Sequence, residues 1–150
     1  MSLRRQIALL SVVIGFSSCD ASGPEGPVLE LARAKTIWNA SSIASYEYVV
    51  ANQCFCGMGG VPVRIVVQNS VIQSMTVVST GQPVPLTMAG AYHTIDGLFG
   101  VIDDAIRRDA AQITARYSPT YGFPNEVFID YSKNTADEEF GFGITSFTRR

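Results

Sequence analysis

The residues most able to do chemistry in this 150-residue chain are Cys54 and Cys56, which flank Phe55. In a flat strand their side chains point to the same face, with Cα atoms about 6.6 Å apart. That distance is near the upper limit for a disulfide, so a bridge requires a local bend, which the glycines in 57–60 permit. The pair is compatible with a structural disulfide, a redox-active pair, two free thiols or, with Met58, a soft-metal site.

His93 is the only histidine, and it limits the catalytic sites that the chain can build. A catalytic triad or a histidine-based metal centre would depend on this one side chain, and no serine lies in a Gly-x-Ser-x-Gly motif. Its position at the start of an expected helix favours a surface or capping role. The chain has no four-cysteine or Cys-His zinc spacing. We therefore expect a protein that is not an enzyme, with no catalytic residue, metal or cofactor.

Asp130 begins a stretch that partly matches a calcium-binding loop, with polar residues at alternate positions. The sixth position is Thr135 where such a loop needs Gly, and the twelfth is Gly141 where it needs Glu. The acidic run 137–139 lies within the same stretch. We expect a solvated turn here rather than a calcium site.

The start of the chain has the order of charge, apolar run and small residues that is typical of a secretory signal. Arg4 and Arg5 precede an apolar run over 7–16, and two serines lead to Cys19. The run is about half the length of a membrane-spanning helix. The residues that follow the run, up to Cys19, resemble a bacterial lipobox. This resemblance implies that residues 1–18 are removed and that Cys19 is acylated with a fatty acid such as palmitate. The alternative is an ordinary secreted protein with an incidental Cys19.

A lipidated Cys19 implies a bacterial cell-envelope protein, anchored to a membrane, whose domain faces the periplasm or the exterior. Removing residues 1–18 takes away two Arg and lowers the formal charge from −2 to −4. A mildly acidic chain without a Lys/Arg cluster is a poor nucleic-acid binder, so no nucleic-acid partner is expected. Cys54 and Cys56 then remain as an even pair in an oxidising compartment, which favours a disulfide between them.

The Gly/Pro-rich linker 19–27 precedes a single domain over 28–150. Apolar residues at helical spacing predict helices over 28–39 and from Ile95 to Arg108, the second with Thr94 as its N-cap. Alternating apolar residues predict six strands, at 46–50, 63–67, 71–78, 113–117, 127–131 and 140–144. The loop 79–93 between them is long for a compact domain, which indicates a functional or mobile segment.

The order helix-β-β-β therefore occurs twice. It predicts an α+β fold, in which two such repeats form one antiparallel sheet of about six strands with both helices packed on one face. Polar strand residues such as Glu47, Arg64 and Arg116 should face water on the other side. Two aromatic residues in predicted loops, Tyr92 and Tyr121, are candidates for a partner surface.

Several motifs occur together in the mature domain: Cys54-Phe55-Cys56, Thr94-Ile95-Asp96-Gly97-Leu98-Phe99, Tyr121-Gly122-Phe123-Pro124 and Asp137-Glu138-Glu139. In this pattern the domain resembles a family of small bacterial envelope lipoproteins catalogued as a domain of unknown function. The resemblance implies no mechanism. Our first hypothesis is a non-enzymatic, lipid-anchored module that binds an envelope protein or a small ligand. The alternative is a thiol-redox or soft-metal protein that acts through Cys54 and Cys56.

Overall fold

A computed structural model describes residues 26–135 and 137–150 of the chain. The elements are, in order, α1 (Gly26–Ser41), β1 (Tyr46–Gln53), β2 (Val63–Gln68), β3 (Val71–Val77), the 3-10 helix η1 (Leu86–Ala91), α2 (Ile95–Arg107), β4 (Gln112–Tyr117), β5 (Pro124–Asp130) and β6 (Phe140–Arg149). The expectations for the signal, for Cys19 and for most of the linker concern residues 1–25 and lie outside the described residues. None of the helices in the described ranges is long and apolar enough to cross a membrane.

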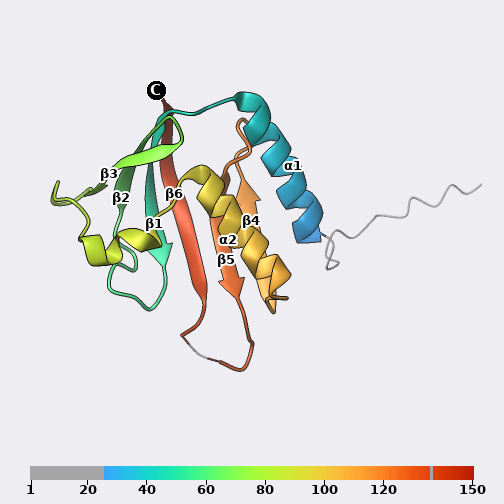
Figure 1. The fold of residues 1–150 in the computed structure, drawn as a ribbon. Coiled ribbons are helices and arrows are strands. Elements are labelled where there is room, and N and C mark those ends of the chain that lie inside the picture. Colours follow the sequence, from blue (N-terminus) through green and yellow to red (C-terminus); the bar gives the residue numbers. More distant parts are fainter. Residues whose placement is uncertain (1–25, 136) are drawn as a thin grey trace, which may run out of the picture.

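The six strands form one antiparallel sheet in the spatial order β3-β2-β1-β6-β5-β4. Each long helix is followed by three strands that pair in sequence order, and β1 pairs with β6 to join the two halves. Figure 1 shows α1 and α2 on the same face of the sheet, over the half that contains β4 and β5. The predicted α+β fold of two helix-β-β-β units is confirmed.

The core lies between the helices and the sheet, and the spacing of the apolar residues explains which helix faces point inward. The buried helix residues are Leu31, Ala34 and Trp38 in α1, and Ile95, Leu98, Phe99, Ile102 and Ala105 in α2. Thr94 Oγ1 accepts the N–H of Gly97 at 3.1 Å, which confirms the predicted N-cap of α2. Asp96 in the first turn and Arg107 in the last turn both complement the helix dipole.

β6 differs from its predicted length and alternation. It continues to Arg149, beyond the predicted Ile144, because all of β1 pairs with residues 141–149 of β6. A bulge at Thr145 shifts the alternation by one residue. Phe147 therefore returns to the core face, where its ring stacks on that of Phe123 with 4.4 Å between the centroids.

Other boundaries also differ from the prediction by one to three residues, among them the end of α1 at Ser41, the end of β1 at Gln53 and the start of β5 at Pro124. α1 begins at Gly26, two residues before the predicted Val28. Pro27 therefore lies inside the first turn of the helix, where proline is well tolerated. β5 ends at Asp130, so Tyr131 lies beyond the strand.

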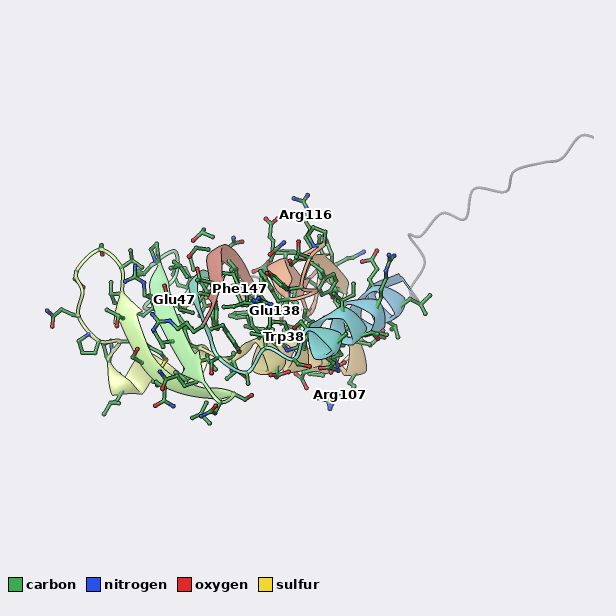
Figure 2. The ribbon with its side chains drawn as sticks, turned by 90° about the horizontal axis from the view of Figure 1, so that it is seen from above. Trp38, Glu47, Arg107, Arg116, Glu138 and Phe147 are labelled. Atoms are coloured by element: carbon green, nitrogen blue, oxygen red, sulfur yellow. A yellow bond between two sulfur atoms is a disulfide. The ribbon has the colours of Figure 1, made fainter. Side chains whose placement is uncertain are left out.

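The face of the sheet opposite to the helices carries charged residues, as predicted. The Arg116 guanidinium lies 3.2 Å from a carboxylate oxygen of Glu126, and Arg150 forms an ion pair with Glu47. Figure 2 shows Arg116 and Arg107 projecting in opposite directions from the molecule. Such exposed pairs contribute about 0–1 kcal/mol each, so the core rather than this face holds the fold together.

Candidate partner-binding site

Three large apolar side chains are exposed at the end of the sheet where β1 ends and β2 begins. The exposed fraction is 87% for Phe55, 93% for Leu86 and 38% for Met88. Phe55 lies in the β1–β2 loop, and the other two belong to η1, which lies beside that loop (Figure 1). We name these three residues, together with Cys54 and Cys56, the apolar tip.

Close backbone packing shapes the β1–β2 loop. The Gly60 N–H donates to the carbonyl of Asn52 at 2.7 Å, and the Gly59 N–H donates to that of Cys56 at 3.0 Å. A Cβ on Gly59 would lie 2.4 Å from the carbonyl oxygen of Cys54, so this position requires glycine. The loop is therefore folded back on the end of β1 and presents its cysteine segment outward.

Three polar side chains on the core face of β1 hold the segment 91–95, which leads from η1 into α2. The side-chain amide of Asn52 donates to a carbonyl of this segment at 3.0 Å, and the Tyr48 hydroxyl donates to another. The Tyr46 hydroxyl accepts the N–H of Ile95 at 2.8 Å. Burial raises the pKa of Tyr46 to about 12, so its hydroxyl stays protonated at neutral pH. These bonds fix the position of η1 relative to β1.

The β1–β2 loop and η1 also touch each other directly. A Cβ on Gly57 would lie 2.8 Å from Cε of Met88. The apolar tip is thus built from two segments that are distant in sequence, and side-chain hydrogen bonds from β1 to the segment 91–95 hold them in place. A surface fixed before binding loses less conformational entropy when a partner docks.

In the structure Cys54 and Cys56 are joined as a disulfide, which is one of the states that their spacing left open and the one that their even number favoured. Their Cα atoms lie 5.3 Å apart, closer than in a flat strand, because β1 ends at Gln53 and the chain bends after it. Cys56 is exposed and Cys54 is half-buried. Cys56 is therefore the more exposed residue of the pair.

The other residues singled out from the sequence do not join the apolar tip. Tyr92 is 5% exposed and belongs to the core, which corrects the expectation of a partner-facing side chain. The hydrogen bonds from β1 to the carbonyl groups of Ala91 and His93 draw this segment onto the sheet. Tyr121 is half-buried, and its ring packs 5.7 Å from that of Phe147.

His93 is half-buried, and the loss of solvent lowers the pKa of its imidazole, which favours the neutral form at neutral pH. The Asp130 carboxylate accepts the N–H of Ser132 at 2.9 Å and so closes the turn after β5. In the ranges 26–135 and 137–150, no three His, Cys, Asp or Glu side chains gather in a way that could hold a metal ion.

Leu86 and Met88 are functional candidates that the sequence alone did not predict. Both lie in the Pro- and Gly-containing loop 79–93, where no strand or helix periodicity assigns a side chain to one face. The available signal was the isolation of Leu86. A large apolar residue next to Pro85 and without a periodic partner has no core-facing stripe to join.

We predict that Cys54 and Cys56 are disulfide-bonded in the exported protein and that loss of the bond weakens the domain by only about 1–2 kcal/mol, because the closed ring is small. Intact mass after alkylation, with and without reductant, measures the bond, and denaturant melts of Cys54→Ser/Cys56→Ser measure the stability. Two alkylated thiols without reductant would contradict the first part. Complete unfolding of the variant would contradict the second.

Residues 30–149 match the family described as "Family of unknown function (DUF6174)". The match covers nearly all of the described domain and includes the whole sheet up to Arg149. The resemblance to a domain of unknown function is thereby confirmed. No curated protein and no solved structure matches the chain.

Proposed function

We propose that this chain, which belongs to the DUF6174 family of unknown function, is a non-enzymatic, lipid-anchored module of the bacterial cell envelope that binds a protein partner through its apolar tip. The observation that carries the proposal is the exposure of Phe55 and Leu86 on a pre-formed surface. Single exposed apolar residues are common, but a cluster of large ones at one end of a domain is typical of interaction surfaces.

The composition of the apolar tip favours a protein partner. Aromatic residues and methionine are enriched in the centres of protein interfaces, where they fill pockets on the partner. Met88 adds a flexible side chain that adapts to an irregular surface. Neither Phe55 nor Leu86 belongs to the packed core, so the fold does not depend on them.

Charge beside the apolar tip also favours a protein over an anionic membrane surface. Gly141 of β6 pairs with Gln53 at the end of β1, so the acidic run 137–139 leads into the sheet directly beside the cysteine loop. Acidic headgroups would repel these carboxylates. A protein partner with an apolar centre and Lys or Arg at its rim satisfies both features.

Substitution at the apolar tip should abolish partner binding without weakening the fold. Phe55→Ser and Leu86→Ser should each shift stability by less than about 0.5 kcal/mol, since both side chains are exposed. Each should lower recovery of the partner at least tenfold when the tagged chain is cross-linked and purified from its native envelope. Val71→Ser is the matched control, because Val71 is 59% exposed but lies at the opposite end of the strands. Equal recovery from all three variants would contradict the proposal.

The anchor should depend on Cys19. The charge, apolar length and small-residue exit of the signal support this part of the proposal. Cys19→Ala should release the protein from the membrane or leave an uncut precursor, as measured by fractionation and intact mass. Mature protein of Cys19→Ala that stays in the membrane fraction would refute it.

The exposure of Cys56 supports a second candidate function, thiol–disulfide exchange with a dithiol protein held at the apolar tip. A partner thiolate would attack Sγ of Cys56, and the electron pair of the broken bond would leave on Sγ of Cys54. The partner's second thiolate would then attack the mixed disulfide and release Cys56. The partner dithiol loses two electrons and becomes a disulfide, while Cys54 and Cys56 gain them and end as thiols. A soft metal ion would need both cysteines as thiolates, so the soft-metal alternative applies only to the protein with a reduced Cys54–Cys56 pair.

Two matched variants distinguish exchange from a structural disulfide. Cys54→Ser leaves the exposed Cys56 thiol, which attacks the disulfide form of the partner, displaces one partner thiolate and should trap the partner as a mixed disulfide that reductant releases. Cys56→Ser leaves the half-buried Cys54 and should trap less. Absence of any mixed disulfide with either variant would remove this second candidate and leave the binding proposal intact.

A further inference from the structure

A groove with a volume of about 480 Å³ lies between α1 and the end of β4, on the side of the molecule away from β2 and β3. It is lined by Glu30, Arg33, Ala34 and Ile37 of α1, by residues 115–119 and by Gly122. The residues from α1 are spaced three and four apart, so they form one stripe of the helix. That stripe shares Ala34 with the core stripe of Leu31, Ala34 and Trp38 and faces β4.

The strand residues that line the groove show that it follows the edge of β4 rather than one of its faces. Ala115, Arg116 and Tyr117 are consecutive, and successive side chains of a strand point to opposite faces. A cavity that touches all three therefore lies along the backbone edge of the strand. β4 is the last strand of the sheet, and within the described ranges its one strand partner is β5.

The opposite edge of the sheet, at β3, is partly covered by another segment of the same chain. Along β3, the Val77 N–H donates to the carbonyl of Gln82 at 2.9 Å, and the Val84 N–H donates to that of Met75 at the same distance. Thr76 and Pro83 form an antiparallel bridge. An extended segment of the protein thus pairs with the end of β3, whereas the described residues place no such segment along β4. Unpaired edges attract strands, and natural proteins usually cover or blunt them.

We propose that the edge of β4 at 115–117 binds an extended polypeptide segment of a partner as a further antiparallel or parallel strand. The main-chain N–H and C=O groups of every second residue of an edge strand point outward and supply the hydrogen bonds. Side chains on one face of the added strand enter the groove.

The residues that line the groove determine which side chains the bound segment should carry. Ala34, Ile37 and Ala115 offer an apolar surface that accepts a small or medium apolar side chain at every second position. Glu30 and Arg33 stand on the exposed rim, one turn of helix apart, and offer both signs of charge to its polar flanks. This site is separate from the apolar tip, which lies at the end of β1 in the other half of the sheet.

A display experiment tests the proposal on the full chain. Linear twelve-residue peptides displayed on phage are selected against it, and amide hydrogen exchange is measured for the chain with each selected peptide. Bound peptides should slow exchange in 112–117. Ile37→Arg should weaken their binding at least tenfold, whereas Leu29→Arg, on the same helix but outside the groove and 66% exposed, should leave it unchanged.

Three results would overturn the proposal. The first is a selection that yields no binders, or binders that protect only 54–60 and 86–91. The second is full protection of 112–117 in the free monomer, which would mean that the chain covers its own edge. The third is a stable dimer in solution with 112–117 protected, which would assign the edge to a second copy. The exchange pattern of the unsubstituted chain decides the question even if Ile37→Arg unfolds.

Discussion

Gly122→Ala should destabilise the domain by about 3 kcal/mol or more and lower its melting temperature by roughly 10 °C. Gly122 has a φ of +78°, and a Cβ added there would lie 2.3 Å from the carbonyl oxygen of Ala34 and 3.0 Å from Cβ of Ile37. The turn between β4 and β5 is thus packed directly on the backbone of α1. The Ser118 N–H donates to Phe123 and the Ser118 carbonyl accepts from Gly122, both at 2.8 Å, so the turn cannot easily move away.

Gly60→Ala is the matched control for this effect. Gly60 has a similar φ of +74°, but an added Cβ meets nothing within 4 Å. It should cost only the backbone strain, about 1 kcal/mol. Thermal and denaturant melts of the two variants measure the difference. Equal losses would mean that α1 does not press on the β4–β5 turn, and the groove beside β4 would then lose one of its walls.

Phe99→Ala should cost about 3–5 kcal/mol through lost burial and the cavity left behind. Phe99 lies in the middle of the buried stripe of α2 and is 3% exposed. Asp103→Ala on the same helix should cost about 1 kcal/mol or less, since the Asp103 carboxylate makes a partly exposed ion pair with Lys35. Denaturant melts that rank the two variants in the opposite order would show that α2 presents another face to the sheet.

The sequence was sufficient to predict the helices, the strands and the two-fold repetition, because these follow from local periodicity. α2 was located to within one residue since its apolar spacing, its N-cap Thr94 and its terminal charges all agree. The order of the strands had no such signal. The contact between β1 and β6 joins residues as distant as Tyr46 and Arg149, and no local pattern marks that pairing.

The candidate site was predictable only in part. A disulfide between Cys54 and Cys56 was favoured because they are an even pair in an expected oxidising compartment, although their spacing alone left other states open. The burial of Tyr92 was not predictable. It depends on hydrogen bonds from Tyr48 and Asn52 to carbonyl groups more than thirty residues away, and such bonds leave no periodicity in the sequence.

The most direct test of the proposed function is site-specific photocross-linking in the native envelope. A photoreactive phenylalanine analogue replaces Phe55 in one variant and Val71, at the other end of the strands, in another. We predict that the variant at 55 forms a discrete cross-linked product with one protein, that Leu86→Ser in the same chain abolishes it, and that the variant at 71 forms none. Equal cross-linking from 55 and 71, or a product at 55 that persists with Leu86→Ser, would contradict the assignment of the apolar tip as the partner-binding surface.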